Sequence, residues 1–116
     1  MIRVLVVDDS IPFLAAATEV VLAADGFELA GVAHTGEEGV ELARVSRPDL
    51  ALIDLNMPGI QGEETAERLA TASPETAIIL MTATPGRRTE GVFDKRNLSP
   101  AALAEIWARA QTPIVP

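Results

Sequence analysis

Five short runs of apolar residues alternate along this chain with longer segments that carry helix caps and helix breakers. The apolar runs predict strands over residues 2–7, 28–33, 50–54, 77–81 and 91–94. The segments between and after them predict helices over residues 11–24, 37–45, 62–72 and 100–110. Nearly continuous apolar strands are typical of a sheet that is buried on both faces, and strands alternating with helices usually form parallel sheets. We therefore expect an α/β fold with a doubly wound, five-stranded parallel sheet.

The predicted connection between the fourth and fifth strands is unusually short. Only eight residues, 83–90, separate Thr82 from Gly91, whereas a crossover that contains a helix normally needs at least about 10–12 residues. Eight extended residues span about 26 Å, which is enough to return alongside a short strand. We predict that the fourth helix is missing or reduced to a turn, and that residues 83–90 are irregular and mobile. The face between strands four and five should then expose apolar surface.

Polar side chains follow the predicted strands at their carboxyl ends, where open parallel sheets bind ligands. Asp8 and Asp9 follow the first strand, and Asp54 ends the third. Thr82 ends the fourth, and Lys95 follows the fifth. If the first and third strands are adjacent, three carboxylates converge with a hydroxyl and an ammonium opposite them. Clustered carboxylates repel one another, so the arrangement favours a hard cation such as Mg²⁺.

A carboxylate beside Mg²⁺ and a lysine can accept a phosphoryl group, because both cations neutralise charge on the transferring oxygens. The predicted intermediate is therefore an aspartyl phosphate on Asp54. Thr82 is expected to hydrogen-bond a phosphoryl oxygen and so to connect the phosphate with the loop behind it.

The length, charge and cysteine content of the chain exclude several classes of protein. The 116 residues suffice for one domain, the net charge is −8, and there is no cysteine. An acidic chain without a basic stripe argues against direct nucleic-acid binding, and the lack of cysteine excludes disulfides and Cys-ligated zinc. No apolar run approaches the about 18–20 residues that span a bilayer, and a first strand at Ile2 leaves no room for a signal peptide. We expect a cytoplasmic protein without a membrane partner.

Four segments together resemble the receiver domains of two-component response regulators. They are Val-Val-Asp-Asp-Ser (6–10), Leu-Ile-Asp-Leu-Asn-Met-Pro-Gly (52–59), Met-Thr-Ala (81–83) and Asp-Lys-Arg (94–96). The resemblance covers essentially the whole chain, and the combined spacing is specific although each fragment alone is weak. It implies a CheY-like, flavodoxin-like fold with strand order 2-1-3-4-5. It also implies Mg²⁺-dependent phosphorylation by a sensor histidine kinase or a phosphotransfer protein.

The resemblance assigns a role to each matching position. It implies Asp54 as the phosphoacceptor, Asp9 as a direct Mg²⁺ ligand, Asp8 as a ligand chiefly through water, Asn56 as a ligand through its backbone carbonyl, Ala83 as the residue that leaves room for the phosphoryl group, Thr82 as the switch hydroxyl and Lys95 as the phosphate contact. A receiver catalyses only its own phosphorylation and dephosphorylation, so we do not expect an enzyme that turns over an external metabolite.

The chain departs from the family pattern at two places. The family's output or dimer surface commonly includes a full fourth helix with the fifth strand and the last helix, and the short connection must remodel it. We expect a homodimer or output partner to use the face of strands four and five and the last helix. The family's aromatic switch residue usually lies three positions before the lysine, where this chain has Val92. Phe93 lies one position later and on a strand would point to the opposite face.

Two other functions are alternatives to phosphorylation. The first is an interaction module of the same fold that no longer depends on phosphorylation, as the short connection and Val92 suggest. The second is a Mg²⁺-dependent phosphohydrolase with an aspartyl nucleophile, but this would need Asp-x-Asp on the first strand, which Asp8-Asp9-Ser10 does not provide.

The remaining conspicuous residues receive ordinary roles. His34 is predicted to be a surface residue, Trp107 a packing residue of the last helix, and Arg87-Arg88 part of a solvated loop. We divide the chain into a receiver domain over residues 1–110 and a tail or linker start over residues 111–116.

Overall fold

The computed structural model describes residues 1–84, 86 and 91–111 of the chain. Its strands are β1 (Ile2–Val7), β2 (Phe27–Ala33), β3 (Leu50–Asp54), β4 (Ala77–Thr82) and β5 (Phe93–Asp94). Its helices are α1 (Ile11–Ala23), α2 (Gly36–Ser46), α3 (Gly62–Ala72), the 3-10 helix η1 (Lys95–Asn97) and α4 (Pro100–Gln111). The predicted bounds hold to within one residue for every predicted element except β5.

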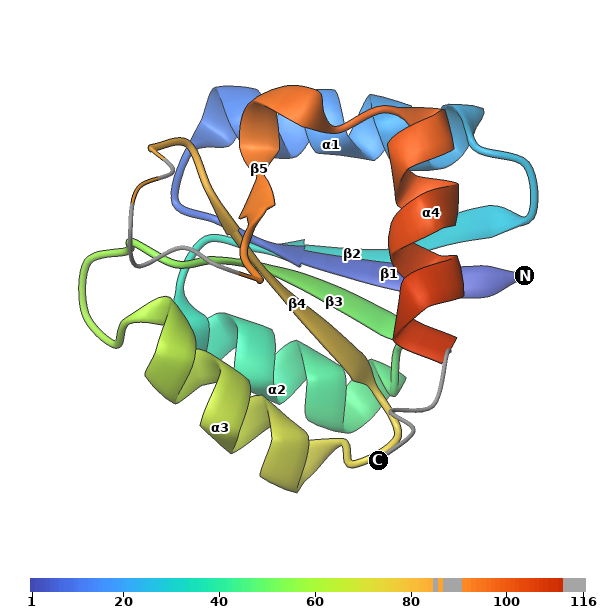
Figure 1. The fold of residues 1–116 in the computed structure, drawn as a ribbon. Helices are drawn as coiled ribbons and strands as arrows, with labels where there is room; N and C mark the ends of the chain where they lie inside the picture. The colour runs from blue at the N-terminus through green and yellow to red at the C-terminus, as the bar shows by residue number, and fades with distance from the viewer. Residues whose placement is uncertain (85, 87–90, 112–116) are drawn as a thin grey trace, which may run out of the picture.

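The strands form one parallel sheet in the order β2-β1-β3-β4-β5. Helices α1 and α4 cover one face of this sheet, and α2 and α3 cover the other (Figure 1). The predicted α/β, doubly wound fold with strand order 2-1-3-4-5 is therefore confirmed. Because every strand runs in the same direction, the carboxyl ends of β1, β3 and β4 all meet at one edge of the sheet.

Side chains of the two central strands alternate strictly between two cores. The even-numbered residues of β1 and β3 pack toward α1 and α4, and they are Val4, Val6, Leu50 and Leu52. The odd-numbered residues pack toward α2 and α3, and they are Leu5, Val7, Ala51 and Ile53. All eight side chains are fully buried. By the same alternation Asp8 and Asp54 continue the even-numbered row, which directs both carboxylates to the α1 side of the sheet.

Serine side chains cap the first turns of the two helices on that side. The hydroxyl of Ser10 accepts a hydrogen bond from the backbone N–H of Phe13 at 3.3 Å, and the hydroxyl of Ser99 accepts one from Ala102 at 3.0 Å. Trp107 of α4 packs, partly buried, against the core beneath α1 and α4. The predicted packing role of Trp107 thus agrees with the structure.

β5 is shorter than the sequence predicts. The strand was expected from Gly91, but Gly91 has φ +81°, which lies outside the β region, so pairing with β4 begins only at Phe93. Two register pairs join the strands, Met81 with Phe93 and Thr82 with Asp94. Phe93 packs against the core on the α1 and α4 side.

No helix lies between β4 and β5 among the residues described there, which are 83, 84, 86, 91 and 92. Residues 85 and 87–90, on which most of the predicted irregular segment and the Arg87-Arg88 pair fall, lie outside the described part. Helix α4 continues to Gln111, one residue into the predicted tail, and residues 112–116 also lie outside the description. Within the described residues, no helix combines the length and the apolar character needed to cross a membrane.

Candidate functional site

Adjacent strands bring the predicted acidic residues together at the carboxyl edge of the sheet. β1 and β3 pair directly, with Val7 opposite Ile53, so the residues that follow them emerge side by side. Asp8 and Asp54 are buried, whereas Asp9 is exposed. One carboxylate oxygen from each of Asp8, Asp9 and Asp54 lies within 4.8 Å of the other two. The convergence expected from the strand order is therefore present.

Asp8 uses its two carboxylate oxygens differently. Oδ1 accepts a hydrogen bond of 2.8 Å from the backbone N–H of Ser10, which ties down the loop between β1 and α1. Oδ2 is buried and accepts no hydrogen bond. The ammonium of Lys95 lies 2.5 Å from it, but off the direction of a hydrogen bond. A buried carboxylate oxygen in this state retains the capacity to bind a further cation or donor.

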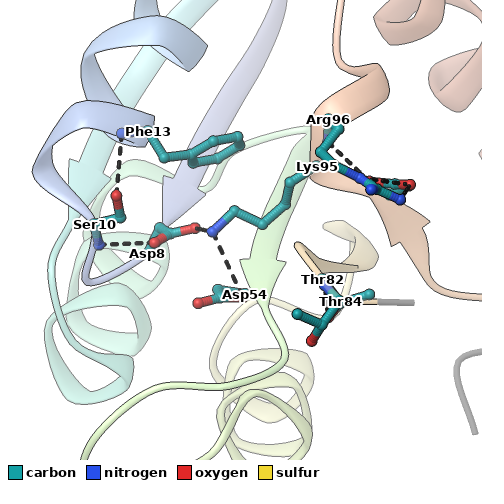
Figure 2. Close-up of polar contacts among 9 residues, drawn as sticks. Asp8, Ser10, Phe13, Asp54, Thr82, Thr84, Lys95 and Arg96 are labelled. Atoms are coloured by element: carbon teal, nitrogen blue, oxygen red, sulfur yellow. Dashed lines mark hydrogen bonds and ion pairs between the residues drawn. The ribbon is translucent and has the colours of Figure 1, made fainter. Parts of the chain in front are cut away.

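Lys95 is the only lysine of the chain and reaches the cluster from η1. Its Nζ lies 2.5 Å from Asp8 Oδ2 and 3.8 Å from Asp54 Oδ1, and its side chain is only 10% exposed. The same nitrogen lies 4.4 Å from the centre of the Phe13 ring. Figure 2 shows the lysine extending between the ring and the two carboxylates. The predicted position of Lys95 beside the acidic cluster is thus found in the structure.

The environment of Asp54 opposes its ionisation. Burial raises the pKa of Asp54 to about 6, and the negative charges of Asp8 and, to a smaller extent, Asp9 act in the same direction. The ammonium of Lys95 and a hydrogen bond from the backbone N–H of Asn56 act against them. A carboxylate that is poorly compensated by its own protein gains from any added cation.

The donor set fits a magnesium ion. Mg²⁺ binds oxygen at about 2.0–2.1 Å in octahedral geometry, which places ligand oxygens about 2.9 to 4.2 Å apart. Carboxylate oxygens within 4.8 Å of one another approach this spacing with small side-chain movements. The buried Oδ2 of Asp8 accepts no hydrogen bond and is paired with the Lys95 ammonium, so it remains an anionic oxygen that can also face a metal ion. The residues that could hold Mg²⁺ are Asp8, Asp9 and Asp54.

Three other predicted residues surround the cluster. Thr82 is fully buried at the end of β4, and its hydroxyl accepts a hydrogen bond of 3.1 Å from the backbone N–H of Thr84. Ala83 is exposed directly after it, and Asn56 is exposed two residues after Asp54. Their predicted roles toward a phosphoryl group or a metal remain predictions. The exposed His34 contacts Glu38 instead of the acidic cluster, with Nδ1 3.4 Å from Oε1.

Two residues that contact this site were not found from the sequence. Phe13 contacts Lys95 through its ring, and Gly62, at the start of α3, lies against the backbone of Asp54. An added Cβ at Gly62 would lie 2.4 Å from the carbonyl oxygen of Asp54. The only available signals were an aromatic residue in the turn after Asp8-Asp9-Ser10 and a glycine at a predicted helix start.

A comparison with protein families decides what kind of chain presents this site. A family model described as "Response regulator receiver domain" matches residues 4–91. The chain belongs to the response regulator receiver family. The resemblance inferred from the four sequence segments is thereby confirmed.

Individual relatives agree with this assignment. The receiver domain is 39% identical over 82 residues to the response regulator GacA of Pseudomonas viridiflava. This alignment covers 71% of this chain and 38% of that protein. The receiver domain is 33% identical over 109 residues to a putative transcriptional regulator of Pseudomonas aeruginosa, covering 94% of this chain and 50% of that protein. The receiver domain therefore spans half or less of the length of these curated relatives.

A solved structure shows the same fold. The response regulator domain of Thermotoga maritima CheB superposes with a TM-score of 0.80 at 24% identity, over 97% of this chain and 98% of that one. At this level of identity the likeness establishes the architecture of the receiver domain.

Proposed function

We propose that this receiver domain accepts a phosphoryl group on Asp54 in a Mg²⁺-dependent reaction within two-component signal transduction. The donor is the phosphohistidine of a sensor histidine kinase or of a phosphotransfer protein. The observation that carries the proposal is the position of the Lys95 ammonium, 3.8 Å from Oδ1 of the buried Asp54. The modification then changes the binding of a partner protein or a second copy. No external metabolite is turned over.

In the proposed step, a carboxylate oxygen of Asp54 attacks phosphorus while the bond from phosphorus to the donor's imidazole nitrogen breaks, and the nitrogen keeps the electron pair. Lys95 is placed to neutralise charge on the phosphoryl oxygens. A Mg²⁺ ion held by Asp8, Asp9, Asp54 and the backbone carbonyl of Asn56 would supply further charge neutralisation.

The end of β4 completes the proposed site. Ala83 adds only a methyl group beside the phosphoryl position. The Thr82 hydroxyl accepts a hydrogen bond from the backbone N–H of Thr84, and a hydroxyl that accepts one bond can also donate its proton, here to a phosphoryl oxygen. Such a bond would connect the phosphate with the segment that follows β4, which is how receiver phosphorylation would reach a partner-binding surface.

Removing the lysine tests the proposed charge stabilisation. Lys95→Met is expected to slow labelling by acetyl phosphate and Mg²⁺ about 100-fold, because one fixed charge aimed at the transferring group is lost. The matched control is Arg96→Met, since Arg96 is the next residue and its exposed side chain pairs with Asp94 at 2.6 Å. That exposed pair should matter little for the reaction. Equal rates for the two variants would contradict the role of Lys95.

An apolar face of α1 beside the site supports a protein as the phosphoryl donor. Ile11 is 68% exposed and Leu22 is 69% exposed. Ala15 lies exposed between them on the same side of the helix, and Glu19 is the only charged residue of α1. An exposed helix face with one charge is unusual for a surface that stays in water. Ile11 follows Asp9 of the acidic cluster by two residues, so a donor protein seated on this face would lie beside the cluster.

The α1 face can be tested by comparing two donors. Ile11→Glu should slow transfer from a phosphorylated sensor kinase at least about tenfold more than it slows labelling by acetyl phosphate, because a buried charge opposes docking. The kinase would be one, from a purified panel, that phosphorylates the wild-type chain. Val45→Glu is the matched control, because Val45 is 73% exposed on α2 across the sheet. If Ile11→Glu slows transfer from the kinase and labelling by acetyl phosphate equally, the α1 face does not bind the donor protein.

A second candidate function is an interaction module that works without phosphorylation. The two-residue β5 and the lack of a helix among the described residues between β4 and β5 favour it. We propose the face of β4, β5 and α4 as the partner or homodimer surface in either case. This face contains a pocket of about 320 Å³ lined by Ile79, Gly91, Val92, Phe93, Ile106 and Arg109. Partner binding that is indifferent to Asp54→Asn would favour the second function.

A further inference from the structure

The ring of Phe13 lies against the ammonium of Lys95. Phe13 belongs to the first turn of α1, is half-buried, and packs against the core beneath α1 and α4. The ring centre is 4.4 Å from Nζ, well within the about 6 Å over which a cation is attracted to an aromatic face. In Figure 2 the ring lies on one side of the lysine and the carboxylates of Asp8 and Asp54 lie on the other.

Among the described residues, the Lys95 ammonium makes two further contacts, an ion pair with Asp8 at 2.5 Å and a longer one with Asp54 at 3.8 Å. The strand that precedes it contributes only two register pairs to the sheet, and Lys95 itself begins the short helix η1. The side chain is long, with four rotatable carbon–carbon bonds. Its contact with Asp8 lies off the direction of a hydrogen bond, and Asp54 is farther away, at 3.8 Å. The ring therefore supplies a third and independent contact at the charged end of the side chain.

We propose that Phe13 is a positioning residue that holds the Lys95 ammonium beside Asp54 and shields it from water. This inference rests on the proposed function, in which Lys95 assists phosphoryl transfer to Asp54. Without the ring the ammonium occupies other side-chain conformations and is beside Asp54 for a smaller fraction of the time. Phe13 itself touches neither Asp54 nor the transferring group.

The effect requires an aromatic ring, because an aliphatic side chain fills space without attracting a cation. Phe13→Leu is expected to slow labelling by acetyl phosphate and Mg²⁺ about tenfold, whereas Phe13→Tyr keeps a rate near that of the wild type. Phe27→Leu is the matched control. Phe27 belongs to the same core cluster but begins β2 at the opposite edge of the sheet. Its replacement should lower stability and leave the labelling rate unchanged.

A second measurement reports the contact without any phosphorylation. Lys95 is the only lysine, so protein made with ¹³C-labelled lysine gives a single ε-methylene signal. The nearby ring should shift this signal upfield in the wild type and in Phe13→Tyr, and the shift should disappear in Phe13→Leu.

Together, the labelling rate and the lysine signal distinguish failure of the role proposed for Phe13 from failure of the proposed function. An unshifted lysine signal in the wild type overturns the role of Phe13, whatever the labelling shows. Phe13→Leu labelling at the wild-type rate, or failure of Phe13→Tyr to keep that rate, also overturns it. If the wild type is not labelled at all, the proposed function fails, and the lysine signal still decides whether Phe13 holds the ammonium.

Discussion

Replacing Asp54 with asparagine is expected to raise the free energy of unfolding of the metal-free protein by up to about 3 kcal/mol at about pH 8, and to change it little at about pH 4. Burial and the charge of Asp8 raise the pKa of Asp54 from 3.8 to about 6. The folded protein therefore binds this proton more tightly than the unfolded chain does. That contribution to stability is fully present below the unfolded pKa and is lost as the pH rises through about 6. Asparagine remains neutral throughout.

The measurement is urea unfolding of both proteins, without metal, at several pH values between about 4 and 8. The difference in free energy should grow up to a pH slightly above 6 and then stay constant. Asp94→Asn provides a control of opposite sign, because hydrogen bonds from Arg96 lower the pKa of Asp94. Because its pKa is lowered, ionised Asp94 stabilises the folded protein at neutral pH, and this stabilisation is lost at low pH. Solvent screening keeps the contribution small. Parallel stability curves for the wild type and Asp54→Asn would contradict the raised pKa of Asp54.

Gly62→Ala is expected to lower the free energy of unfolding by about 2–3 kcal/mol and to slow labelling of Asp54. A Cβ at this position would lie 2.4 Å from the carbonyl oxygen of Asp54 and 2.7 Å from Cα of Leu55. Both neighbours are backbone atoms, so α3 or the end of β3 has to move. The gain of about 1 kcal/mol that alanine offers in a helix is smaller than this cost. The displaced backbone carries the Asp54 side chain, which links the stability loss to the chemistry.

Gly31→Ala is the matched control for this change. An added Cβ there would meet side-chain carbons of Leu42 and Leu5 at 3.7 and 3.9 Å, which are ordinary contacts. Its stability should therefore equal or slightly exceed that of the wild type. Urea unfolding and the rate of labelling by acetyl phosphate are compared for both variants. If Gly62→Ala proves as stable as Gly31→Ala, then α3 does not lie against the backbone of Asp54.

A parallel sheet between helices was predictable from the pattern of apolar and polar residues, whereas the strand order 2-1-3-4-5 followed from the resemblance to receiver domains. Nearly continuous apolar runs in β1 and β3, caps such as Ser10 and Ser99, and the alternation of strands with helices all indicate the same α/β fold. The beginning of β5 was not predictable, because a glycine such as Gly91 is compatible with both a strand and a turn. Its positive φ depends on how the chain returns from β4.

The acidic cluster also followed from the sequence, since parallel strands bring their carboxyl ends to one edge. Asp8, Asp54 and Lys95 could therefore be placed at the same edge of the sheet from the sequence alone. The contact with Phe13 could not, because it depends on how η1 directs the lysine across the first turn of α1. The close approach of Gly62 depends in the same way on how α3 packs against β3. Both are relations between elements that are distant in sequence.

The most direct test of this account is the intact mass of the protein after incubation with acetyl phosphate, with Mg²⁺ or with a chelator. With Mg²⁺ the wild type should gain the mass of one phosphoryl group, and reduction of the trapped acyl phosphate followed by peptide mapping should locate it at Asp54. The chelator, and separately Asp54→Asn, should each prevent the gain. Labelling that is independent of Mg²⁺, or that persists in Asp54→Asn, would contradict the proposal that this acidic cluster is a metal-dependent phosphoacceptor site.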